Sequence, residues 1–182
     1  MNVEFELRIL NIDKGAIVKK LESIGAHKVH DEVLQRRYIM DFPDNRLWKK
    51  GGWIRLRKAG DLRVELSFKK RSHPHTIDSA KETYLEISDF DTAHELLKQI
   101  GLEDKRYQEN KRMRYKKNNV VFDIDTWPGK NTYMEIESNN EKNVWSAVDE
   151  LGFTKEECTF TAGPDLMALL GFSEEQQKNI RF

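Results

Sequence analysis

Acidic and large apolar residues alternate in two short runs near opposite ends of the chain, Glu4-Phe5-Glu6-Leu7-Arg8 and Glu135-Ile136-Glu137. On a β-strand, a period of two places the carboxylates of each run on one face, roughly 7 Å apart, and the apolar residues on the other face. Like charges held side by side on a sheet are unfavourable unless a positive group lies over them. Because hard divalent cations prefer oxygen ligands, these glutamates are candidate metal ligands.

Charged residues recur with the same period on the strands predicted between the two runs. The sets that share a face are Arg55 and Arg57, Arg63 with Glu65 and Lys69, Glu82 and Glu86, Arg112 and Arg114, and Asp123 and Asp125. For any one strand, the solvent-facing side of an antiparallel sheet explains the alternation. The whole set favours a closed sheet, in which the first and last strands meet and their carboxylates converge. Such an interior has acidic and basic walls that suit a metal together with a polyanion.

Phosphate is the polyanion that these side chains fit. Arginine offers a planar fork that matches phosphate oxygens, and lysine offers a compact charge. Magnesium is typically bound through one or two carboxylates together with substrate phosphates. Phosphoryl transfer depends on positioning and charge neutralisation more than on covalent chemistry by the protein. The chain has no Walker-type glycine loop, so we do not expect a P-loop enzyme.

The elements that must position these residues follow from periodicity and turn signals. Strands are predicted over residues 3–10, 27–41, 53–58, 62–70, 81–88, 107–116, 120–126 and 132–138. Helices are predicted after the N-caps Asp13 and Asp89, over 142–151 and near 166–170. The stretch 71–79, with His73 and His75, is predicted to be a loop rather than a zinc site. We therefore expect one α+β domain over residues 1–182, built on an antiparallel sheet or barrel.

Composition limits the classes of partner. Lys plus Arg and Asp plus Glu both number 31, so the formal net charge is zero and no excess positive field favours nucleic acid or a membrane surface. The single cysteine, Cys158, excludes an internal disulfide and fits a reducing compartment. The first residues form a charged strand pattern rather than a signal peptide, and no apolar run approaches about 20 residues. We expect a cytoplasmic protein.

These runs resemble the signatures of the CYTH proteins, or triphosphate tunnel metalloenzymes. Glu4-Phe5-Glu6-Leu7-Arg8 is similar to the family's Glu-x-Glu-x-Lys, with arginine in the last position. The strands that follow in the family's order are similar to Ile54-Arg55-Leu56-Arg57, Phe68-Lys69, Glu82 with Glu86, Asn110-Lys111-Arg112, Asp123-Ile124-Asp125 and Glu135-Ile136-Glu137. Each motif alone is weak, but together they cover residues 1–138 in the right order.

The resemblance implies an eight-stranded antiparallel tunnel that binds a triphosphate, with Mg²⁺ or Mn²⁺ held by glutamates. Carried over by position, the metal ligands are Glu4, Glu6, Glu135 and Glu137, with Asp125 assisting. The phosphate ligands are Arg8, Arg55, Arg57, Lys69, Arg112 and Arg114. The choice between Arg112 and Arg114 is left open, because Asn110 stands where the family pattern has a lysine. Arg8 would keep the charge of the signature lysine but is larger and binds bidentately, which affects rate and substrate preference.

Several functions are consistent with these residues. The leading hypothesis is metal-dependent hydrolysis of inorganic tripolyphosphate, thiamine triphosphate or a nucleoside triphosphate, with Glu82 or Glu86 as the proton acceptor. A class IV-type adenylate cyclase and a non-catalytic receptor for triphosphate or polyphosphate are alternatives, as is a scaffold with an ordinary wet sheet face. Trp48, Trp53 and Trp127 could stack on an organic ring, although packing in the core or at the rim is favoured. The oligomeric state is left open, with a homodimer as one choice.

Overall fold

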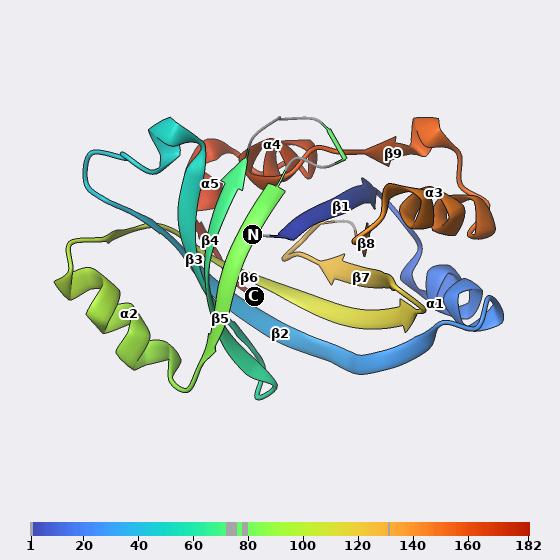
Figure 1. The fold of residues 1–182 in the computed structure, drawn as a ribbon, viewed down its shortest axis with the longest axis horizontal. Coiled ribbons are helices and arrows are strands. Elements are labelled where there is room, and N and C mark those ends of the chain that lie inside the picture. The colour runs from blue at the N-terminus through green and yellow to red at the C-terminus, as the bar shows by residue number, and fades with distance from the viewer. Residues whose placement is uncertain (1, 72–75, 78–79, 131) are drawn as a thin grey trace.

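The computed structural model describes residues 2–71, 76–77, 80–130 and 132–182, with the side chains of 2–4 and 80 excepted. The predicted loop residues His73 and His75 lie outside the described residues. Eight long strands dominate the rest (Figure 1): β1 (Asn2–Ile9), β2 (His27–Asp41), β3 (Gly52–Ala59), β4 (Arg63–Arg71), β5 (Ala80–Ile87), β6 (Glu103–Lys117), β7 (Val120–Thr126) and β8 (Tyr133–Ser138).

The eight long strands pair in a ring. The sheet runs β6-β2-β3-β4-β5-β1-β8-β7, and β7 pairs in turn with β6. Every pairing between long strands is antiparallel, and the shortest joins β1 to β5 through three residue pairs. Two short strands extend the sheet: β9 (Cys158–Thr159) beside β1, and β10 (Asn179–Ile180), which runs parallel to β6. The predicted antiparallel, tunnel-like α+β fold is confirmed.

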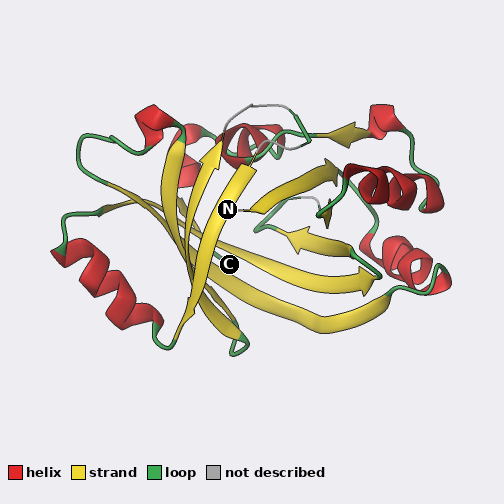
Figure 2. Cartoon of the chain, viewed as in Figure 1, coloured by secondary structure: helices red, strands yellow, loops and turns green. Residues whose placement is uncertain are grey.

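Helices lie at the periphery of this ring (Figure 2). They are α1 (Lys14–Ser23), α2 (Phe90–Gln99), α3 (Glu141–Glu150), α4 (Gly163–Leu169) and α5 (Glu174–Lys178), with 3₁₀ turns at Trp48–Lys50 and Lys155–Glu157. The predicted N-caps are confirmed, because Asp13 accepts a hydrogen bond from the Ala16 amide at 2.7 Å and Asp89 accepts one from the Thr92 amide at 2.6 Å. No helix among the described residues is long and apolar enough to cross a membrane.

The apolar side chains of the strands face outward, under the helices. On β1, Leu7 and Ile9 join a buried cluster with residues of α1 and α3, whereas Glu6 and Arg8 point into the ring. On β3, Leu56 packs in a second cluster with α2. A third cluster joins the start of β8 and the β7–β8 connection to α4 and to residues on both sides of α5. The alternation in the sequence thus builds a ring with an apolar outside and a charged inside.

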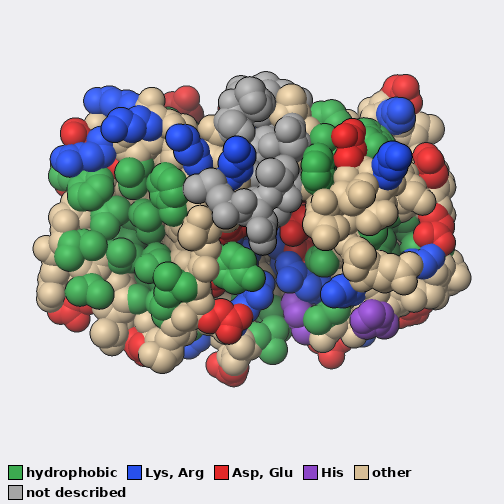
Figure 3. Space-filling model, viewed as in Figure 1, with side chains coloured by type: hydrophobic (Ala, Val, Ile, Leu, Met, Phe, Trp, Pro, Cys, Tyr) green, Lys and Arg blue, Asp and Glu red, His purple; other side chains and the backbone are tan. Residues whose placement is uncertain are grey.

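The outer surface is not uniformly polar. Apolar side chains gather on the face over α2 and β5 (Figure 3), where Leu85, Leu96 and Ile100 are exposed. Of the predicted elements, the eight strands and the main helices are present within a few residues of their expected bounds. The sequence did not predict β9, α5 or β10, and β6 begins at Glu103 rather than near Tyr107.

Candidate active site

A cavity of about 290 Å³ lies inside the ring. This volume is at the lower end of the range for small-molecule sites. Ten basic side chains line it: Arg8, Arg37, Arg55, Arg57, Arg63, Lys69, Arg71, Arg106, Arg112 and Arg114. Five acidic side chains line it too: Glu6, Glu65, Glu82, Glu135 and Glu137. Since the whole chain has a net charge of zero, the positive excess is local to this cavity.

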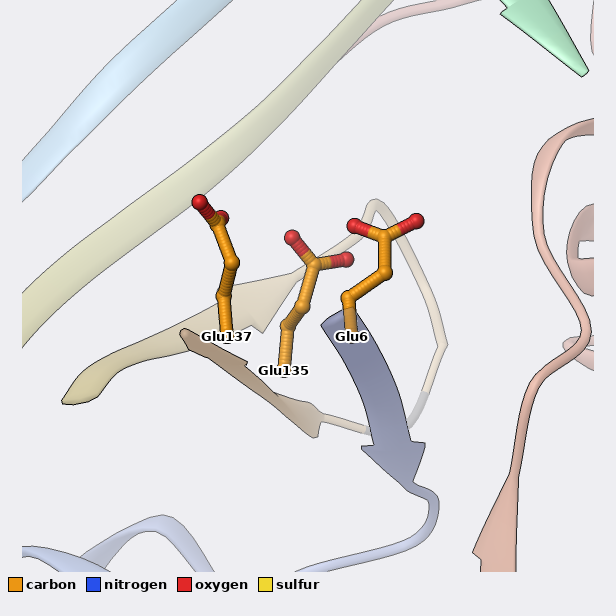
Figure 4. Close-up of side chains that lie close together, drawn as sticks. All are labelled: Glu6, Glu135 and Glu137. Carbon is orange, nitrogen blue, oxygen red and sulfur yellow. The ribbon is translucent and has the colours of Figure 1, made fainter. Parts of the chain in front are cut away.

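Three glutamates converge on one wall of the cavity. Glu6 on β1 and Glu135 and Glu137 on β8 each offer a carboxylate oxygen, and these oxygens lie within 4.8 Å of one another (Figure 4). The strand register causes this, because Glu6 lies opposite Glu137 and Arg8 lies opposite Glu135. Three converging carboxylates fit a hard divalent cation. The side chain of Glu4, the fourth predicted ligand, is outside the described part of the structure.

Arg8 binds two of these three carboxylates. Its Nη2 lies 2.9 Å from Glu6 Oε1 and 2.7 Å from Glu135 Oε2. Its Nη1 donates a hydrogen bond to the carbonyl oxygen of Thr161 at 3.3 Å, which ties β1 to the C-terminal segment. Although burial raises the pKa of Glu135, the charges of Arg8 and Arg112 hold that pKa well below its usual range. Glu135 is therefore an ionised carboxylate at neutral pH.

Arg112 and Arg114 extend the basic wall along β6 and are fixed from behind by aspartates of β7. Arg112 donates from Nε to Asp125 Oδ1 at 2.8 Å and from Nη1 to Asp123 Oδ2 at 2.5 Å, while Arg114 forms two bonds of 2.6 Å to Asp123. Both aspartates are buried and neither lines the cavity. Asp125 holds Arg112, and its oxygens are not among those of the glutamate cluster, so its assisting role stays a prediction. Arg112 and Arg114 both line the cavity, and the choice between them as phosphate ligands stays open.

A second ionic network covers the β3–β5 wall. Arg55 Nη2 lies 2.8 Å from Glu82 and 3.1 Å from Glu65, and Lys69 Nζ lies 2.8 Å from Glu82. Arg57 Nη2 lies 2.9 Å from Glu65. Glu65 was not among the predicted site residues. In the structure it forms ion pairs with Arg55 and Arg57, the two arginines of β3.

The predicted proton acceptors, Glu82 and Glu86, lie in different surroundings, and their role stays a prediction. Burial raises the pKa of Glu82, but Arg55 and Lys69 lower it further, to about 2. At that pKa Glu82 would be a weak base at neutral pH. Glu86 is exposed, lies opposite Glu65 on the neighbouring strand and does not line the cavity.

Aromatic residues line part of the same cavity. Trp48 and Trp53 lie with ring centroids 5.9 Å apart, and Trp48 is exposed. Tyr84 of β5 is exposed beside the cavity. Trp127 is buried against Phe172, which agrees with the packing role that the sequence favoured. Trp48 and Trp53 thus place aromatic rings beside the basic side chains of the cavity.

Sequence reasoning missed Arg37 of β2, which also lines the cavity. The only signal was its place in the predicted strand 27–41, two residues after Gln35 and two before Ile39. Arg71, Arg106 and Tyr133 were missed as well, since each stands near a strand end or connection where periodicity is weak.

The comparison with protein families decides the relationship. The sequence model of the CYTH domain matches residues 1–159. The chain belongs to the CYTH family. No curated protein sequence matches the chain significantly.

Solved structures of similar fold come from several organisms. A candidate adenylate cyclase from Vibrio parahaemolyticus superposes with a TM-score of 0.81 at 14% identity, over 92% of this chain and 98% of that one. A protein from Pyrococcus horikoshii gives 0.71 at 22% identity, over 87% and 94%. A candidate adenylyl cyclase from Hippeastrum with a dominant triphosphatase activity gives 0.64 at 17% identity, over 92% and 94%. At these identities the likeness shows the fold alone.

Proposed function

We propose that this CYTH protein hydrolyses a triphosphate compound in a reaction that depends on a divalent metal. Inorganic tripolyphosphate, thiamine triphosphate and nucleoside triphosphates are the candidate substrates. One observation carries the proposal: among the described residues, twice as many basic as acidic side chains line the cavity, and three of the acidic ones converge on one wall. A polyanion neutralises the first group, and a hard cation neutralises the second.

The basic residues suit phosphoryl groups by geometry as well as charge. Arg55, Arg57 and Arg112 are each held by carboxylates, so their forks are fixed before a ligand arrives. Fixed donors stabilise charge that develops on phosphoryl oxygens without reorganising during the reaction. Lys69 adds a compact charge on the same wall. These groups would bind the triphosphate, orient it and stabilise the charge on the leaving phosphate.

Glu6, Glu135 and Glu137 would hold the metal, with Glu4 as a further candidate, and Mg²⁺ and Mn²⁺ both suit carboxylate oxygens. When bound, such a metal neutralises phosphate charge and makes a coordinated water more acidic. Arg8 Nη2 contacts one oxygen of Glu6 and one of Glu135, and the second oxygen of each carboxylate would be available to the metal. We do not assign Glu82 or Glu86 as the proton acceptor.

The structural neighbour from Hippeastrum supports hydrolysis, since its dominant activity is that of a triphosphatase. A second function, the formation of cyclic AMP and pyrophosphate from ATP, is favoured by a different observation. Trp48 and Trp53 offer ring faces at the cavity on which an adenine could stack. The neighbour from Vibrio parahaemolyticus, a candidate adenylate cyclase, is consistent with this alternative. The cytoplasmic location and the homodimer stay predictions from the sequence.

Products distinguish these functions. The protein is incubated with tripolyphosphate, thiamine triphosphate and ATP, each with Mg²⁺ or Mn²⁺, and the products are resolved by chromatography. We expect orthophosphate that is lost in Glu135→Gln and kept in the control Glu86→Gln, which is outside the cavity. Pyrophosphate with cyclic AMP from ATP would establish the cyclase instead. Tight binding with no product would identify a receptor, and neither binding nor product would refute the polyanion site.

A further inference from the structure

Arg37 and Arg57 are direct cross-strand partners on β2 and β3. Both side chains line the cavity. Like charges opposite one another in a sheet are destabilising unless a counter-charge lies between them. The two arginines differ in the groups that bind them.

Arg57 has a carboxylate and Arg37 does not. Arg57 Nη2 lies 2.9 Å from Glu65 Oε1. Arg37 Nη2 donates to two neutral amides, Gln35 Oε1 at 3.3 Å and Asn110 Oδ1. Within the described part of the structure, the buried Nε of Arg37 has no hydrogen-bond partner. Among the described residues, no carboxylate forms an ion pair with Arg37.

The surroundings of this guanidinium are electropositive. Burial and the nearby charges of Arg112 and Arg55 lower the pKa of Arg37, and burial and Arg55 lower that of Arg57. Asn110 holds Arg37 firmly, because its Nδ2 donates to Asp125 at 2.6 Å while its Oδ1 accepts from Arg37. A cation that lines a cavity and is held in place by neutral amides is arranged for an anion that comes from outside.

The strand order places this pair opposite the glutamates. In the ring β6-β2-β3-β4-β5-β1-β8-β7, three strand steps separate β2 from β8 on one side, and three separate β3 from β1 on the other. The Arg37–Arg57 pair therefore faces the β1–β8 wall that carries Glu6, Glu135 and Glu137. Arg8 lies among those glutamates, so a ligand that reaches both walls meets a guanidinium at each one. This suits a molecule that is anionic along its length, as a condensed phosphate is.

We propose that Arg37 is a substrate-binding residue, which together with Arg57 clamps a phosphoryl group of a condensed phosphate against the glutamate wall. This inference rests on the proposed function, since it assigns a further ligand to the same substrate. The phosphoryl oxygens supply the counter-charge that Arg37 lacks in the protein. Arg37 thus differs from Arg55, Arg57, Arg112 and Arg114, which carboxylates of the protein neutralise in part.

Binding of sodium tripolyphosphate in the presence of a chelator tests this without turnover. Calorimetry compares the wild type with Arg37→Gln, Arg37→Lys and Arg36→Gln. Arg36 is the matched control, because it lies next in the same strand but pairs with Asp91 outside the cavity. We expect the affinity to fall by about tenfold or more in Arg37→Gln, less in Arg37→Lys, and not in Arg36→Gln.

Thermal unfolding of the free protein separates binding from support of the fold. Removing one of two opposed charges relieves repulsion, so the free Arg37→Gln variant should not melt below the wild type, while its tripolyphosphate-induced rise in Tm shrinks. Unchanged affinity in Arg37→Gln, or a lowered Tm with unchanged affinity, overturns this inference and leaves the proposed function intact. A wild type that binds no tripolyphosphate, with chelator or with Mn²⁺, overturns both.

Discussion

Arg8 stands where the Glu-x-Glu-x-Lys signature has its lysine, and it contacts two carboxylates of the cavity. A guanidinium presents a planar fork, and that of Arg8 joins Glu6 and Glu135, the two buried members of the glutamate cluster. The guanidinium of Arg8 therefore lies between two carboxylates that are candidate metal ligands. At the proposed metal site, the charge of Arg8 would oppose that of a divalent ion beside the same carboxylates, so residue 8 would affect metal affinity.

Arg8→Lys should therefore bind metal more tightly. A lysine ammonium is flexible, strongly hydrated and unable to bridge in a fixed fork, so it releases the carboxylates more readily. We expect the Kd for Mn²⁺, measured by calorimetry without substrate, to fall about five- to tenfold, which corresponds to ~1 kcal/mol. Arg46→Lys is the control, because Arg46 is exposed and pairs only with Asp44 near the surface. Unchanged or weaker Mn²⁺ binding in Arg8→Lys would contradict competition at this site.

Glu82 links the cavity to acid stability. Its pKa is about 2 in the folded protein, against an ordinary value of 4.5, so folding favours its ionised form. The stabilisation is complete above about pH 4.5 and is lost as the pH falls towards 2. In Glu82→Gln this contribution is absent at every pH, so the Tm gap between wild type and variant should narrow as the pH is lowered from 6 to 3. A constant gap would show that Glu82 contributes through packing alone; Glu86→Gln should show no gap.

At the scale of elements, the turn after β2 depends on a single carboxylate. Asp41 is buried and accepts hydrogen bonds from the backbone amides of Phe42, Leu47 and Trp48 at 2.7, 3.1 and 2.8 Å. These bonds fix the connection to β3 and the 3₁₀ turn that begins at Trp48. The orientation of the exposed tryptophan at the cavity is therefore set from the end of β2.

Asp41→Ala should affect stability and substrate choice together. Buried amides left without acceptors cost about 1–3 kcal/mol, which urea unfolding would measure. With Trp48 no longer fixed, we expect KM to rise for thiamine triphosphate or ATP and to change little for tripolyphosphate, which has no ring. Asp41→Asn keeps one acceptor oxygen, so its stability and its KM values should lie between those of the wild type and Asp41→Ala. Equal changes in KM for all three substrates would show that Trp48 does not contact the organic part.

Alternation along the chain was sufficient to predict the strands and the charged face of each, because a period of two is a local property. The partner of each charge was not predictable, because it depends on register between strands. Asp125 shows this: Arg112 lies opposite Asp125 of β7, and the two side chains bind each other. Arg37 could be recognised as a cavity residue only from the pairing of β2 with both β3 and β6.

The short C-terminal elements escaped prediction for another reason. β9 and β10 contain two residues each and α5 contains five, too few for any period to emerge. Their positions are set by contacts with distant strands, as where β10 pairs with β6. The capping of α5 by Ser173, which accepts from the Gln176 amide at 3.2 Å, was the one local signal available.

At the scale of the whole molecule, charged side chains are unevenly distributed although their total is balanced. Its net charge is zero, yet the cavity is basic and the outside carries apolar clusters under helices. The CYTH sequence model ends at residue 159, but Leu166 and Met167 beyond it line the cavity. The C-terminal segment is thus part of the site, held there by its packing on Trp127 and Tyr133.

Phe172 is the residue through which this dependence can be tested. Its ring meets that of Trp127 at 6.2 Å in an edge contact and is buried in the cluster that joins α4 to the sheet. Phe172→Ala should lower the free energy of unfolding by about 3–5 kcal/mol, and the loosened α4 should weaken tripolyphosphate binding at temperatures where the protein is still folded. Phe182→Ala is the control, since Phe182 is exposed. Lost stability with unchanged affinity would mean that the segment supports the fold only; loss of both shows that residues past the family's boundary help to form its site.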